Sequence, residues 1–107
     1  MSRESGFQAS FIRHLRELFP DAIILKNDAN YLQGVPDILV LIGPRWCAFE
    51  CKMRPTSPQE ANQGYYVTLM NEMSFATFVW PGNEKDILDE LQRAFKPRRA
   101  ARVSQPQ

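Results

Sequence analysis

The stretch GVPDILVLIGPRWCAFECKM, residues 34–53, decides the fold. Residues 37–42 form an apolar, β-branched run that predicts a buried strand, and residues 46–53 predict its hairpin partner. Gly43-Pro44-Arg45 separates the two runs and is typical of a turn. The hairpin therefore brings its two ends, at Asp37 and at Glu50 to Lys52, toward the same edge of the predicted sheet.

Alternate side chains of the second strand point to opposite faces of the sheet. Its odd-numbered positions, from Cys47 to Met53, are all apolar and are expected to meet the core. The even-numbered face carries Glu50 and Lys52 side by side. Charges in a strand surrounded by apolar residues cost desolvation free energy unless a partner or a function offsets that cost.

The length of the turn decides whether Asp37 joins these two charges. With an even number of loop residues, Asp37 lies opposite Glu50 on the same face, with Cβ atoms about 5 Å apart. A divalent cation between two such carboxylates relieves their repulsion, and oxygen ligands favour Mg²⁺ or Mn²⁺. An odd loop would instead place Asp37 beside the core residues and remove this site.

Lys52 adds an ammonium group on the same face. It can polarise a water and offset the negative charge that builds on a phosphate under attack. Asp37, Glu50 and Lys52 with one or two metal ions suffice for phosphodiester hydrolysis. The simplest competing interpretation is a structural salt bridge within the hairpin. A Ser-His-Asp triad is excluded, because the one histidine, His14, lies in the first predicted helix, where a surface or half-buried place is expected.

The remaining elements surround this hairpin. Residues 3–19 predict a helix with Ser2 as its cap, and residues 22–26 predict a strand. The other expectations are a helix from near Ser57 with an apolar stripe (Tyr66, Leu69, Met70, Met73), a strand at 75–80 and a last helix capped by Asn83 and ended by Pro97. The prediction is an α/β fold in the order α-β-β-β-α-β-α, a mixed sheet flanked by helices.

Composition and charge indicate one domain, residues 1–96, followed by a basic and disordered tail, residues 97–107. The net charge of the chain is +1, yet all twelve acidic residues precede position 93. The basic end suggests a polyanionic partner or, more simply, a solvated terminus. No secretory signal or membrane span is visible, and Cys47 and Cys51 are expected as reduced core thiols. The expected location is the cytoplasm of a bacterium or of a phage-infected host cell.

The motif Pro36-Asp37 with Glu50-Cys51-Lys52 resembles that of the PD-(D/E)XK nuclease superfamily. The Gly34-Val35-Pro36-Asp37 lead-in is similar to that of its virus-type replication-repair nuclease (VRR-NUC) group, in the small, stand-alone phage or bacterial form. A glutamine in the following helix matches the same group, with Gln63 the better counterpart and Gln59, one turn earlier, the alternative. The resemblance covers roughly residues 4–80 and implies a restriction-endonuclease-like core.

The resemblance also implies the roles of individual residues and of the whole protein. Asp37, Glu50 and the main-chain carbonyl of Cys51 would bind Mg²⁺ or Mn²⁺, with Lys52 and Gln63 completing the catalytic set. An acid from the first helix would stand near the metal; Glu4, with Gln8 one turn later, fits better than Glu17. The expected protein is a metal-dependent DNA endonuclease, a homodimer that cuts branched DNA such as a Holliday junction.

Several basic residues are candidates for contacts with phosphates of nucleic acid. Two alternatives to the junction nuclease stay open: a non-catalytic nucleic-acid-binding module, and a nuclease of the same fold that acts on duplex DNA or on RNA. Four aromatic residues are candidates for stacking on bases, although core packing explains at least two of them: Tyr65, Tyr66, Trp46 and Trp80. The candidate phosphate contacts are Lys26, Arg54, Arg3, Arg98 and Arg99.

Overall fold

The computed structural model describes residues 3–95, which form a small α/β domain around one four-stranded sheet. The strands lie in the order β1-β2-β3-β4; the first three are antiparallel neighbours, and β4 runs parallel to β3. The predicted α/β class and mixed sheet are therefore confirmed. The elements are α1 (Arg3–Leu18), β1 (Ile23–Lys26), β2 (Ile38–Ile42), β3 (Arg45–Cys51), α2 (Gln63–Met73), β4 (Phe75–Val79) and α3 (Glu84–Ala94).

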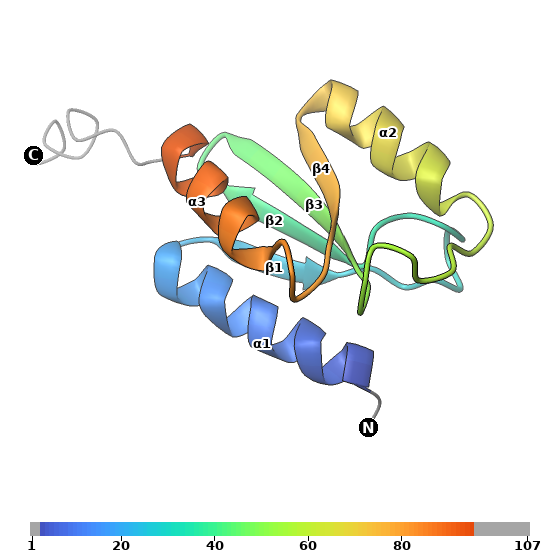
Figure 1. The fold of residues 1–107 in the computed structure, drawn as a ribbon. Coiled ribbons are helices and arrows are strands. Elements are labelled where there is room, and N and C mark those ends of the chain that lie inside the picture. The colour runs from blue at the N-terminus through green and yellow to red at the C-terminus, as the bar shows by residue number, and fades with distance from the viewer. Residues whose placement is uncertain (1–2, 96–107) are drawn as a thin grey trace, which may run out of the picture.

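Helices α1 and α3 lie on one side of the sheet and α2 on the other (Figure 1). The main core is between the sheet and the α1/α3 pair, where the rings of Phe11 and Phe49 meet edge to face at 5.1 Å between centroids. Both side chains are fully buried. Residues spaced three or four apart supply the helical half of this core because that spacing keeps them on one helix face: Phe11, Ile12, Leu15, Ile87, Leu91 and Phe95.

The second helix begins at Gln63 and not near Ser57, so that prediction is wrong. The intervening segment is held outside the helix because the Pro58 carbonyl accepts a hydrogen bond from the Lys52 ammonium, and Asn62 adopts a left-handed conformation with φ 69°. The predicted apolar stripe is also only partly right. Val67 is the buried residue of α2, whereas Met73, the last residue of the helix, stays 65% exposed.

Asn83 occupies the position before α3, but its side chain does not cap the helix as predicted. Its Oδ1 accepts a hydrogen bond from the Trp80 N–H at 2.8 Å, and its Nδ2 donates to the Phe78 carbonyl at 3.2 Å. The asparagine therefore fixes the turn between β4 and α3. The strand ends of β4 and β3 meet at this side of the sheet, since the Lys52 N–H donates to the Val79 carbonyl.

Within the part of the chain that the structure describes, no helix is long and apolar enough to cross a lipid bilayer. Cys47 and Cys51 are both free and buried, as expected of core thiols. The predictions for Ser2, for Pro97 and for the basic tail lie outside the described residues.

Candidate metal centre

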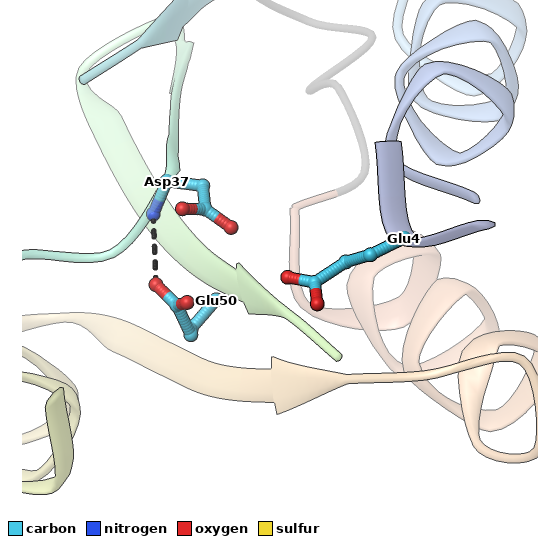
Figure 2. Close-up of side chains that lie close together, drawn as sticks. All are labelled: Glu4, Asp37 and Glu50. Atoms are coloured by element: carbon cyan, nitrogen blue, oxygen red, sulfur yellow. Dashed lines mark hydrogen bonds between the residues drawn. The ribbon is translucent and has the colours of Figure 1, made fainter. Parts of the chain in front are cut away.

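The turn between β2 and β3 has the even length that the charge argument requires. Ile38 pairs with Phe49 and Ile42 with Arg45, so the same register brings Asp37, the residue before β2, opposite Glu50. The Asp37 N–H donates to Glu50 Oε1 at 3.2 Å (Figure 2). Of the two registers that the sequence left open, the structure has the one with an even turn. Glu50 is only 2% exposed, because the face of the sheet that carries it is covered as well.

Hydrogen bonds hold both the backbone and the side chain of Asp37 in place. The Asn27 N–H donates to the Asp37 carbonyl at 2.8 Å, and the Asn27 side chain donates to the carbonyl of the buried Pro36. The carboxylate Oδ2 in turn accepts from the Cys51 N–H at 3.1 Å. Asn27 is a positioning residue that the sequence reasoning missed; its only signal is a polar residue directly after a strand.

Helix α1 contributes the third acid. Glu4 sits in its first turn, and one carboxylate oxygen each of Glu4, Asp37 and Glu50 lies within 4.8 Å of the other two. Figure 2 shows the Glu4 side chain extending from the helix toward the two hairpin acids. The packing of α1 on the sheet through Phe11 sets this approach. Glu17, the weaker candidate, lines a groove between α1 and α3 instead.

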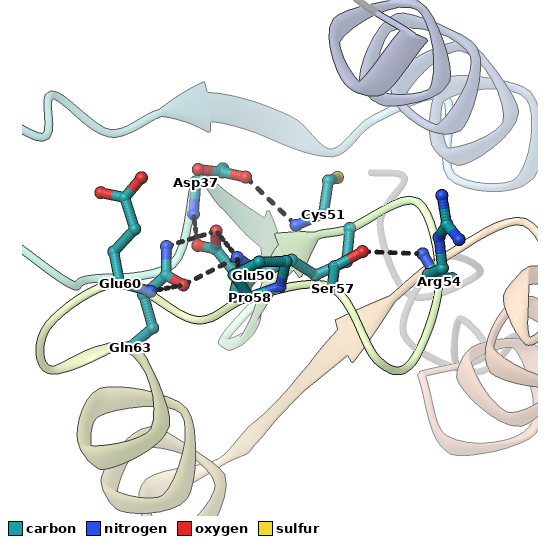
Figure 3. A network of polar contacts seen from close by, with 9 residues as sticks. Asp37, Glu50, Cys51, Arg54, Ser57, Pro58, Glu60 and Gln63 are labelled. Atoms are coloured by element: carbon teal, nitrogen blue, oxygen red, sulfur yellow. Dashed lines mark hydrogen bonds and ion pairs between the residues drawn. The ribbon is translucent and has the colours of Figure 1, made fainter.

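Gln63 forms hydrogen bonds with two of the candidate site residues, Glu50 and Lys52. Gln63 Nε2 donates to Glu50 Oε2 at 2.8 Å, and Gln63 Oε1 accepts from the Glu60 N–H (Figure 3). Gln63 Oε1 also accepts from Lys52 Nζ at 2.8 Å. Lys52 Nζ also donates to the Pro58 carbonyl at 2.9 Å and lies 3.9 Å from Glu50 Oε2. The structure thus brings Gln63, and not Gln59, to the acids.

Gly34 sets the position of this glutamine. Its φ is +94°, and a Cβ there would lie 2.6 Å from both the Ala61 carbonyl oxygen and the Asn62 Cβ. Only glycine allows so close an approach of the loop before Asp37 to the start of α2. The lead-in that the family resemblance singled out therefore has a packing reason in this chain.

Burial raises the pKa values of both hairpin acids. Burial, together with the neighbouring Asp37 carboxylate, raises the pKa of Glu50 from 4.5 to about 8, against the lowering effect of Lys52. Burial also raises the pKa of Asp37, although the Cys51 N–H, the Lys52 ammonium and a Gln8 hydrogen bond lower it. Without a cation, the coupled pair of hairpin acids retains a proton near neutral pH.

The structure describes three of the five residues that are predicted to contact phosphates. Arg3 opens α1 beside Glu4, and Lys26 ends β1 opposite the residue after Asp37; both side chains are exposed. Arg54 is exposed on the loop after β3. Arg98 and Arg99 lie outside the described residues.

Two other residues singled out in the sequence, Cys51 and His14, have side chains that take part in packing and in a contact between helices. The Cys51 side chain is fully buried, as expected, and its carbonyl stays a predicted ligand. His14 is 36% exposed, and its Nδ1 lies 2.6 Å from Glu84 Oε2, a contact between α1 and α3.

The comparisons with protein-family models, with curated proteins and with solved structures find no match for this chain.

Proposed function

We propose that this protein is a Mg²⁺- or Mn²⁺-dependent nuclease that hydrolyses phosphodiester bonds in DNA. The observation that carries the proposal is the cluster of Glu4, Asp37 and Glu50, whose oxygens come within 4.8 Å of one another beside a lysine. Three carboxylates brought this close, two of them with raised pKa values, repel one another unless protons or a cation lie between them.

The donor set fits a hard divalent cation. All three side chains offer oxygen atoms, and the two cysteine thiols are core residues outside the cluster. Burial raises the pKa of Cys47 to about 12, so this thiol is not a thiolate ligand near neutral pH. Glu4, Asp37 and Glu50 would hold the ion, and the Cys51 carbonyl is a further proposed ligand. Such an ion supplies Lewis acidity and neutralises charge on a phosphate.

Lys52 is suited to act on a phosphate or on the attacking water. Its ammonium group has three N–H donors, of which two are used on the Pro58 carbonyl and on Gln63 Oε1. The distance of 3.9 Å to Glu50 Oε2 is too long for a hydrogen bond, so the third donor remains for a substrate oxygen. Gln63 holds Lys52 and Glu50 at a fixed separation and acts as a positioning residue.

We further propose a homodimer that acts on branched DNA. One chain carries one cluster, whereas a four-way junction presents two related strands, which a two-fold dimer would match. The exposed side chains of Ile23 (58%) and Leu25 (44%) on the edge strand β1 support a self-association surface. Sedimentation of the purified protein tests the dimer; a monomer at all concentrations would contradict it.

A cleavage assay tests the nuclease. We expect the protein to nick DNA with Mg²⁺ or Mn²⁺ and to be inactive in EDTA, with branched DNA, such as a four-way junction or a flap, cut faster than blunt duplex. Lys52→Ala should abolish this activity, whereas Lys85→Ala, which removes an exposed lysine on α3, should leave it intact. Since Lys52 is buried, circular dichroism must show that the variant is folded.

The second candidate is a nucleic-acid-binding module without catalysis. The buried Lys52–Gln63–Glu50 network favours it in one respect, because a satisfied network can be purely structural. Cleavage of no substrate in the panel, with nucleic acid still bound, would select this alternative.

A further inference from the structure

A small cavity lies beside the candidate metal centre, between the loop after β3 and the end of β4. Its volume is about 240 Å³, and Lys52, Arg54, Phe78 and Trp80 are among its lining residues. Pockets for drug-sized ligands begin at about 300 Å³. The cavity is therefore smaller than a site for a drug-sized ligand and too small for two adjacent nucleotides.

Two aromatic side chains form the apolar part of its lining. Phe78 and Trp80 are two residues apart at the end of β4, and both are half-buried. A Cβ at Gly82 would lie only 3.0 Å from Trp80 Nε1, so the indole packs against the backbone of this glycine. The backbone of Trp80 is fixed by its hydrogen bond to Asn83. Trp80 is thus held in place in the cavity lining, where an indole can stack on a planar ring.

Two polar side chains at the cavity, those of Arg54 and Gln59, supply a guanidinium group and an amide group. Within residues 3–95, the Arg54 guanidinium has no hydrogen bond or ion pair, although the backbone N–H of Arg54 is bound by Ser57 Oγ at 3.1 Å. Figure 3 shows the guanidinium pointing away from the hydrogen-bond network of Gln63. The exposed Gln59, which also lines the cavity, offers an amide. An aromatic lining with a free guanidinium and an amide matches a base with its phosphate.

Lys52 belongs to both the cavity and the metal centre. Its hydrogen bond to the Pro58 carbonyl holds the loop that carries Arg54 and Gln59, and its hydrogen bond to Gln63 connects it to Glu50. A ring in the cavity would therefore lie next to the phosphate that Lys52 would contact in the proposed nuclease.

We propose that this cavity binds one unpaired nucleobase, stacked on Trp80, of the nucleotide next to the cleaved phosphate. The proposal rests on the proposed nuclease function and narrows its substrate to nucleic acid with an unpaired nucleotide at the cut. A base inside a duplex is stacked on both faces, so it cannot enter without leaving the helix. Single-stranded segments and branch points expose such bases.

Fluorescence of Trp80 tests the cavity without any cleavage. The variant Trp46→Phe leaves Trp80 as the sole tryptophan. In EDTA, we expect an oligothymidylate of about eight nucleotides to quench its emission saturably. A blunt duplex of the same length should not quench it. Absence of quenching by the single strand, or equal quenching by the duplex, would overturn the proposal.

Variants separate stacking from general affinity. Trp80→Ala should weaken binding of the oligothymidylate about 10- to 100-fold, and Trp80→Phe should restore most of it. Tyr31→Ala removes an exposed aromatic outside the cavity lining and should leave affinity unchanged. If Trp80→Ala fails to fold, Arg54→Ala, which changes an exposed side chain, is expected to weaken binding as well. Unchanged affinity in the folded variants would contradict the proposal.

The two proposals fail in distinguishable ways. Saturable quenching of Trp80 without cleavage by any metal would keep the base cavity and reject the nuclease. Metal-dependent cleavage at equal rates in wild type and in Trp80→Ala, with no preference for unpaired nucleotides, would keep the nuclease and reject the base cavity.

Discussion

The cluster of buried acids predicts a specific dependence of stability on pH. The pKa of Glu50 is raised from 4.5 to about 8 in the folded protein by burial and by the neighbouring Asp37. The folded state therefore holds a proton more tightly than the unfolded state does. This contribution to stability is complete below pH 4.5 and is lost as the pH rises toward 8.

The change of the unfolding free energy with pH follows from the one extra proton that the folded state holds. Between the two pKa values the free energy of unfolding falls by about 1.4 kcal/mol per pH unit, or about 3 kcal/mol from pH 5.5 to pH 7.5. The raised pKa of Asp37 acts in the same direction. Urea unfolding in EDTA at several pH values measures the slope.

Glu50→Gln should remove most of the slope, because the variant has no proton to lose at that position. The level of stability will also change, since an amide places a donor against the Asp37 N–H or the Gln63 amide. For this reason the slope, and not the level, is the readout. Glu17→Gln, on the exposed part of α1, is the matched control and should keep the wild-type slope. Parallel curves for wild type and Glu50→Gln would refute the reasoning.

Four further predictions concern the same architecture. Adding Mn²⁺ should flatten the pH slope and raise the melting temperature more at pH 8 than at pH 5, because the ion displaces protons; an equal shift at both pH values would contradict this. Gly34→Ala should cost about 1–3 kcal/mol in unfolding free energy and reduce cleavage, because the new Cβ would displace Asn62 and hence Gln63; wild-type stability would refute the close approach. Phe11→Ala should cost about 3–5 kcal/mol in thermal unfolding, since the ring is fully buried against Phe49; a loss below 1 kcal/mol, which is about the cost of a surface change, would mean that α1 is not docked. Deleting residues 97–107, which include three arginines, should weaken DNA binding and reduce its log-log salt slope by about 2 to 3 with cleavage chemistry intact; an unchanged slope would contradict a role for the tail.

The hairpin was predictable because its signals are local. Parity along residues 46–53 places Glu50 and Lys52 on one face, whereas the length of the turn stayed open in the sequence. The two-residue turn of the structure gives the register that brings Asp37 opposite Glu50. The apolar spacing of the first helix likewise gives the buried face that carries Phe11 into the core.

The start of α2 and the choice between the two glutamines were not predictable in the same way. Both depend on contacts between segments that are distant in sequence. The Pro58 carbonyl is tied to Lys52, and Gly34 packs against Asn62, so the chain enters the helix only at Gln63. Local helix signals at residues 57–62 carry no trace of these tertiary contacts.

Glu4 illustrates the same limit at the candidate site. A glutamate in a first helical turn is explained equally well by the helix dipole, and only the docking of α1 brings it to the hairpin acids. The family resemblance supplied this expectation, whereas the helix pattern by itself did not.

The most direct test of the central claim is anomalous scattering from a crystal soaked in manganese. We expect one strong peak bounded by Glu4, Asp37 and Glu50, with carboxylate oxygens at about 2.0–2.6 Å from it. Its occupancy should fall in Glu50→Gln crystals. A well-ordered map with no peak there, or with the three side chains turned apart, would contradict the proposed metal centre.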